Sequence, residues 1–147
     1  MILERVEKDG LIEALYESSN IVASCYNKNQ KDLTVTFKNG GNYTYQGVSE
    51  TDYFRFETAE SQGKVLNSNL KNYPTLKHES VDVNALIERI KNLKNKELDT
   101  ILIGIEEKII LFTNDLHSTN KKDYDFLEKR LDKISEMITV YKNLKNN

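Results

Sequence analysis

Two tyrosines and a short polar segment are the residues of this chain whose types and spacing suit ligand binding. Tyr43 and Tyr45 lie two positions apart, and Ser61, Gly63 and Lys64 follow close together further along the chain. Aromatic rings stack on nucleobases. Free backbone amides at the start of a helix, with a nearby lysine, hold phosphate. These residues therefore predict a binding site for RNA or for a small nucleotide-like ligand.

The segment around Gly63 is not a nucleotide-binding P-loop. Thr58 stands where the first glycine of that motif belongs, and Val65 stands where a serine or threonine would bind magnesium. We instead expect a short helix that begins here and runs through 66–70, with Ser61 as its cap. The alternative is an ordinary helix cap followed by a lysine that faces solvent.

The chain offers no recognisable catalytic or metal-binding set. The single cysteine, Cys25, alternates with Ile21 and Ala23, which indicates a buried structural thiol rather than a nucleophile. The two histidines, His78 and His117, lack metal-ligand spacing, and we expect both to be solvated. We therefore expect no enzymatic activity, no catalytic residue, no metal site and no cofactor.

The hairpin register decides what the two tyrosines do. A two-residue turn at Asn39 and Gly40 would place Tyr43 and Tyr45 on the threonine face of the preceding strand, as a platform. A three-residue loop with Gly40 or Gly41 in a left-handed conformation would place them on the other face. Asn-Gly favours the first register, although paired tyrosines in a small sheet usually pack into a core. The other face of the strand carries Leu33, Val35 and Phe37.

A succession of short motifs from 18 to 72 resembles a known family. In order they are Ser18-Ser19-Asn20-Ile21, Tyr26, Leu33-x-Val35-x-Phe37, Asn39-Gly40, Tyr43-x-Tyr45, Gly47-Val48, Tyr53, Ala59, Ser61-x-Gly63-Lys64, Asn67 and Leu70-Lys71.

Together these motifs resemble a KTSC domain, a family named for its occurrence at the C-terminus of some lysyl-tRNA synthetases and also found as small bacterial or phage proteins. The resemblance covers about fifty-five of the 147 residues. Ser49 follows Val48 where relatives usually carry a proline, and the segment from Thr75 onward has no counterpart. The resemblance implies a compact α+β module, for which RNA binding has been suggested.

The spacing of apolar residues in the sequence changes at Pro74. Before it, residues 12–46 have period two, which predicts antiparallel strands, and a hydroxyl cap at Ser49 precedes a short helix over 53–59. After it, the period is helical. We expect an α+β fold, with a small antiparallel sheet and short helices in a module over 1–73, followed by a helical segment over 74–147 that ends in an antiparallel hairpin.

Three helices are expected after Pro74. The first follows a cap at Ser80 or Asp82, the second begins near Glu97, and the third follows steps of three and four from Tyr124 to Tyr141. On the second helix, Ile103 and Ile110 lie together on a flank away from its main apolar face. We interpret them as a possible surface for homo-oligomerisation or for a partner protein.

Charge and composition limit the possible partners. The chain has 21 basic and 23 acidic residues, a net charge of −2, so we expect no nonspecific binding to duplex DNA. Lys121-Lys122 and Lys129-Arg130 are a possible small basic patch, and the acidic residues around them dilute its field. No apolar run suits a membrane span and the charged start is unlike a signal peptide, so we expect no membrane association and a cytoplasmic location. Two functions remain: a non-catalytic binder of RNA or a nucleotide-like ligand, and an interaction or oligomerisation module.

Overall fold

The computed structural model describes residues 1–118 and 124–146. It divides into two compact units, Met1–Lys94 and Asn95–Asn147, which we call the N-terminal and C-terminal units. The boundary falls inside a long helix, and each unit is considered separately below.

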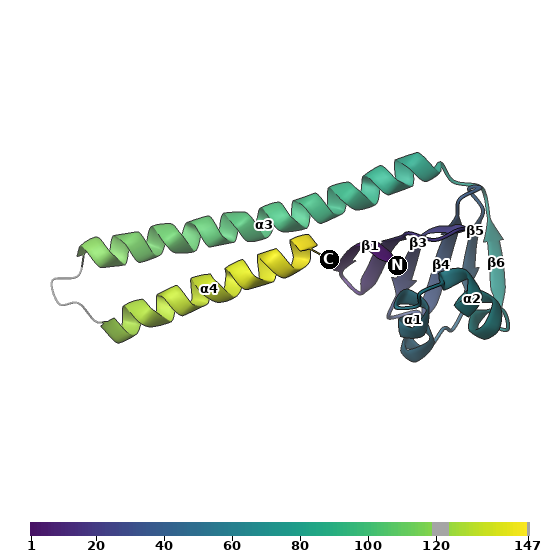
Figure 1. The fold of residues 1–147 in the computed structure, drawn as a ribbon, viewed down its shortest axis with the longest axis horizontal. Helices are drawn as coiled ribbons and strands as arrows, with labels where there is room; N and C mark the ends of the chain where they lie inside the picture. The colour runs from purple at the N-terminus through teal and green to yellow at the C-terminus, as the bar shows by residue number, and fades with distance from the viewer. Residues whose placement is uncertain (119–123, 147) are drawn as a thin grey trace. The chain divides into compact units, whose positions relative to one another are not determined.

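The N-terminal unit is built on a six-stranded antiparallel sheet (Figure 1). Each strand pairs with its neighbours in the sequence, so the strand order is the order of the chain. A β-bulge shifts the pairing between Ile21 and Ala23. The strands are β1 (Ile2–Lys8), β2 (Leu11–Tyr16), β3 (Ile21–Asn27), β4 (Asp32–Phe37), β5 (Asn42–Tyr45) and β6 (Thr75–His78).

Short helices cover one face of this sheet. They are α1 (Glu50–Glu57), α2 (Gln62–Val65) and the π-helical turn η1 (Leu66–Leu70). Ser49 caps α1 as expected, because its hydroxyl accepts a hydrogen bond of 3.1 Å from the Asp52 amide. Phe56 and Leu70 are fully buried against the sheet in the larger core cluster. Tyr26 of β3 stacks on Tyr53 of α1, with ring centroids 4.2 Å apart.

The start of α3 (Val83–Ser118) packs on the opposite face of the sheet. Asp82 caps this helix by accepting a hydrogen bond of 3.1 Å from the Ala85 amide. Ile90 is buried among side chains of β2 and β3, and Arg89 forms an ion pair with Glu13. The two apolar clusters therefore use both faces of the sheet.

In the C-terminal unit, the rest of α3 packs with α4 (Tyr124–Asn146). Ile105 of α3 and Leu127 and Ile134 of α4 are its buried apolar residues among those described. Arg130 Nε lies 3.3 Å from an Asp115 carboxylate oxygen, which joins the two helices. The α+β class predicted from the sequence is confirmed.

The structure corrects two parts of the predicted organisation. The two helices expected on either side of Lys94 form one helix, α3. Neither glycine nor proline interrupts residues 83–103. In addition, Lys94 is buried and its ammonium group donates a hydrogen bond of 3.1 Å to the Arg5 carbonyl oxygen. The described residues of the segment over 74–147 accordingly form two helices, α3 and α4, rather than the expected three. In addition, β6 continues the sheet past Pro74, and the compact units divide between Lys94 and Asn95.

Candidate functional site

The hairpin between β4 and β5 has the three-residue loop, so the favoured two-residue register is wrong. The Phe37 amide donates a hydrogen bond of 2.8 Å to the Gly41 carbonyl oxygen, and Gly40 has φ = 85°. This left-handed glycine gives the loop a bulge that shifts the pairing by one residue. As a result, Tyr43 pairs with Val35 and Tyr45 with Leu33.

Both tyrosines therefore lie on the apolar face of β4, beneath the short helices. Tyr45 is buried, with 8% of its surface exposed, and its burial raises the pKa of the phenol above its ordinary value. Tyr43 is half-buried, and its ring meets the Phe37 ring edge-on at a centroid distance of 5.6 Å. The pair forms a wall joined to the core rather than an exposed platform.

Ser61 precedes α2 as expected, but its side chain makes no capping hydrogen bond. Gln62 is fully buried instead, and its amide donates to the Ala59 carbonyl oxygen at 2.8 Å. The helix that follows has only four residues before the chain passes into the π-helical turn η1. So short a helix has little macrodipole with which to hold a phosphate.

The tyrosines and α2 meet at an open pocket of about 360 Å³, which we call the tyrosine pocket. Its lining combines three aromatic side chains, three asparagine carboxamides and residues of α2 and η1. Of the residues predicted from the sequence, the structure brings together Tyr43, Tyr45 and Gly63, whereas Ser61 and Lys64 lie outside the lining. The pocket is lined by Asn20, Phe37, Asn39, Tyr43, Tyr45, Gly63, Leu66 and Asn67.

None of the described residues that line this pocket is charged. Asn20 and Asn67 are exposed, and each carboxamide presents both a donor and an acceptor. Asn39 is also engaged in the turn, where its side-chain oxygen accepts from the Gly41 amide at 2.9 Å. The arrangement suits a flat, uncharged group that pairs through donors and acceptors while lying against aromatic rings.

The three asparagines of the pocket were not among the site residues predicted from the sequence. Asn20, Asn39 and Asn67 all occur in the ordered motifs quoted above, and they come from three separate loops or helices. The motif succession was the available signal, since no spacing rule links residues so far apart in the chain.

Comparison with known proteins identifies this part of the chain. The KTSC domain family model matches residues 17–73. The chain carries a KTSC domain. A crystal structure of a KTSC domain protein from Yersinia pestis is similar over 47% of this chain and 99% of that chain, with 26% sequence identity and a TM-score of 0.45. The search of curated proteins found no match.

The KTSC domain contributes the whole lining of the tyrosine pocket, from Asn20 to Asn67. Additional strands extend its sheet at both edges, with β1 and β2 on one side and β6 on the other. On β1, Arg5 Nε donates to a Glu57 carboxylate oxygen at 2.7 Å, which fastens this edge to α1. The extensions therefore support the KTSC domain without entering its pocket.

The predicted interaction residues lie in the C-terminal unit. Ile103 and Ile110 are 55% and 59% exposed, respectively. Leu102, Ile109 and Leu116 follow one another at seven-residue intervals on the adjoining side of α3 and are also exposed. This stretch of α3 thus presents an apolar face to solvent as well as the face that packs on α4.

Cys25 and His78, which the sequence singled out, each lie in the N-terminal unit. Cys25 is half-buried, and its burial raises the pKa of the thiol above its ordinary value. His78 is exposed on β6, where its Nε2 lies 2.7 Å from the Thr44 hydroxyl. Across 1–118 and 124–146, no group of three metal-ligating side chains occurs. None of the helices in these ranges is both long and apolar enough to cross a bilayer.

Proposed function

We propose that the KTSC domain of this chain is a non-catalytic binding module that takes the base of RNA or of a small nucleotide-like ligand in the tyrosine pocket. One observation carries the proposal: aromatic rings and three carboxamides meet in a pocket of about 360 Å³ without a charged side chain in its lining. Stacking against rings and hydrogen bonding to base edges are the devices that bind unpaired bases.

The uncharged lining favours an uncharged ligand group such as a base over a phosphate. A base would gain contacts with Tyr43 and with the Asn67 carboxamide, whereas a phosphate would find no cation inside the pocket. Lys64 is exposed just outside the lining. We therefore expect a nucleoside and its 5′-monophosphate to bind with similar affinity, with Lys64 adding only a solvent-screened contact to the phosphate.

Calorimetric titration of the full chain with the common ribonucleosides and their 5′-monophosphates tests the proposal. Gly63 lines the pocket and a Cβ added there meets nothing within 4 Å, so we expect Gly63→Leu to fill space at the pocket and to keep the fold. We expect this variant to abolish nucleoside binding. The exposed Lys71→Leu is the matched control and binds as the parent chain does.

Two results would defeat this proposal. One is the absence of binding by any nucleoside or nucleotide at millimolar concentration, and the other is equal binding by the parent chain and Gly63→Leu. Lys64→Gln adds a further comparison: a loss of affinity for the monophosphate but not for the nucleoside would place Lys64 beside the phosphate.

A second candidate function is self-association or capture of a partner protein through α3. The exposed isoleucines Ile103 and Ile110 favour it, because a soluble helix rarely leaves adjacent apolar side chains uncovered. Sedimentation equilibrium would test self-association directly. We expect Ile103→Glu combined with Ile110→Glu to reduce the mass of any oligomer to that of a single chain, and a parent chain that sediments as a monomer would exclude self-association.

A further inference from the structure

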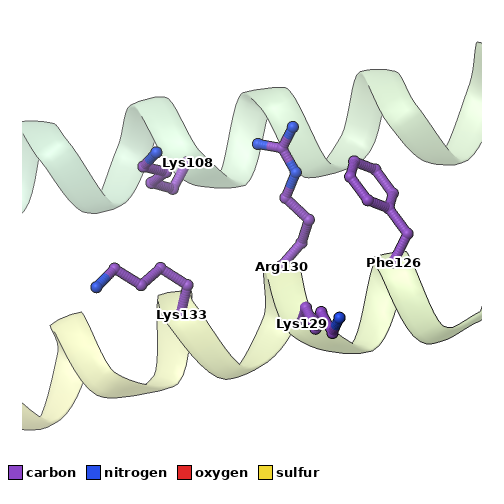
Figure 2. A pocket seen from close by; sticks show the side chains of 5 residues that line it. All are labelled: Lys108, Phe126, Lys129, Arg130 and Lys133. Atoms are coloured by element: carbon purple, nitrogen blue, oxygen red, sulfur yellow. The ribbon is translucent and has the colours of Figure 1, made fainter.

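The C-terminal unit holds a second pocket, whose lining is dominated by cations. It has a volume of about 190 Å³ and lies between α3 and α4. In Figure 2, Phe126 and Arg130 extend from α4 toward α3, which carries Lys108. We call it the lysine pocket, and it is lined by Lys108, Phe126, Lys129, Arg130 and Lys133.

The helical period explains how these cations gather in spite of the acidic residues nearby. On α4, the pocket residues from 126 to 133 follow the spacing i, i+3, i+4, i+7, which places them on one face of the helix. Glu128 lies about 100° around the helix from the nearest of these residues, whereas Asp125 and Asp132 flank the face beside Lys129, four residues before it and three residues after it.

Two carboxylates partly neutralise the four cations. Arg130 Nε lies 3.3 Å from an Asp115 oxygen, and Lys133 Nζ lies 3.5 Å from a Glu136 oxygen. The Lys133 pair is exposed and therefore weak. Within 1–118 and 124–146, neither Lys108 nor Lys129 forms an ion pair. The pocket keeps an excess of positive charge that an anion would compensate.

Phe126 gives the pocket an aromatic side. The Arg130 guanidinium carbon lies 5.0 Å from the centroid of its ring, which is a cation–π contact. The Phe126 side chain is nevertheless 45% exposed. The ring thus lies beside the cations with part of its surface exposed, and sites that bind nucleotides combine aromatic and cationic groups in this way.

We propose that the lysine pocket binds the phosphate groups of a nucleotide, with the base against Phe126. A carboxylate would compensate only one of the cations, whereas a diphosphate concentrates several negative charges in a small volume. Arginine can pair two phosphate oxygens through its planar fork, and lysine supplies a compact point charge. This site differs from the tyrosine pocket in unit and in chemistry, so either can exist without the other.

Calorimetry of the full chain at low ionic strength tests this site with adenosine diphosphate, pyrophosphate, adenosine, a short single-stranded oligoadenylate and polyglutamate. The key variant is Lys108→Gln combined with Lys129→Gln, which removes two unpaired charges and leaves the ion pairs intact. Its control is Lys142→Gln, an exposed lysine of α4 outside the pocket. We expect the key variant to weaken adenosine diphosphate binding about tenfold and the control to change it less than about twofold.

The other ligands separate the possible sources of phosphate and the role of the ring. Binding of adenosine diphosphate alone identifies a free nucleotide, and tighter binding of the oligoadenylate identifies a nucleic-acid strand. Phe126→Leu should weaken adenosine diphosphate binding and leave pyrophosphate binding unchanged. The proposal is overturned if adenosine diphosphate and the oligoadenylate both fail to bind, if the key variant binds like the control, or if polyglutamate binds as tightly as the oligoadenylate.

Discussion

The two units of this chain use their apolar residues differently. The N-terminal unit covers both faces of its sheet, and side chains as large as Tyr26 and Phe56 are fully buried in it. The C-terminal unit buries one side of α3 and leaves Ile103 and Ile110 exposed. A sheet with helices on both faces completes its own core, whereas a two-helix hairpin has surface left over.

The two pockets also differ, in their charge and in how closely they join a packed core. The tyrosine pocket is an uncharged recess continuous with a well-packed core, and the lysine pocket is a charged recess on a helix surface. Rings and amides select by shape and hydrogen bonding, while clustered cations attract anions through charge that salt screens. The following predictions test this contrast, beginning with the largest effect.

Burial in the N-terminal unit predicts the largest difference between two substitutions in one helix. Phe56 of α1 is fully buried, so Phe56→Ala should lower the free energy of unfolding by about 3–5 kcal/mol. Phe54 of the same helix is 62% exposed, and Phe54→Ala should change it by less than about 0.5 kcal/mol. Urea denaturation measures both, and similar losses for the two variants would refute the assigned packing.

The same comparison applied to α3 tests the leftover surface of the C-terminal unit. Ile105 is buried with 6% exposure, so Ile105→Ala should cost about 2–4 kcal/mol, whereas exposed Ile103→Ala should cost less than about 0.5 kcal/mol. Thermal unfolding of both variants checks this. A cost for Ile103→Ala that matches Ile105→Ala and grows with protein concentration would mean that a second copy covers this face.

Two buried phenols predict how alkali affects the N-terminal unit. Burial raises the pKa values of Tyr16 and Tyr53 above the ordinary value of about 10. The folded chain keeps these protons where the unfolded chain releases them, so stability is retained below about pH 10 and falls above it by about 1.4 kcal/mol per pH unit for each group. Urea titrations at increasing pH measure the slope. Tyr53→Phe should reduce it, and an unchanged slope would contradict burial of Tyr53 as its cause.

Much of this fold was predictable because its signals are local. The period-two strands around Val35, the Ser49 cap and the helical period after Pro74 each follow from residues a few positions apart. The hairpin register was not predictable, because Asn39-Gly40 suits both a two-residue and a three-residue loop. The packing of Tyr43 and Tyr45 on the core decides between these two loops. The long α3 was also missed, because the burial of Lys94 depends on β1, far away in the sequence.

Some residues of the candidate sites were predictable from the sequence, and others were not. Residue types alone identified Tyr43, Tyr45 and Gly63, but the asparagines that accompany them come together only through the fold. Lys129 and Arg130 were visible in the sequence. Their association with Lys108 required the pairing of α3 with α4.

The smallest expected effects are changes in the free energy of unfolding when alanine replaces one of two glycines. The backbone conformations at Gly47 and Gly63 predict changes of opposite sign. Gly47 and Gly63 both have open space where a Cβ would lie, but only Gly47 has a left-handed φ, of 73°. Gly47→Ala should therefore destabilise the N-terminal unit by about 1 kcal/mol. Gly63→Ala, in α2, should stabilise it by up to about 1 kcal/mol because alanine favours helix. Chemical denaturation of both variants would contradict this reasoning if the two changes had the same sign.

The central claim is that the tyrosine pocket of the KTSC domain is a base-binding site. The most direct test is a titration of the ¹⁵N-labelled full chain with nucleosides, followed through its backbone amide resonances. We predict saturable shifts at Tyr43, Gly63 and Asn67, which are lost in Gly63→Leu. Shifts that are absent, or that occur only at residues outside the pocket, would contradict the claim.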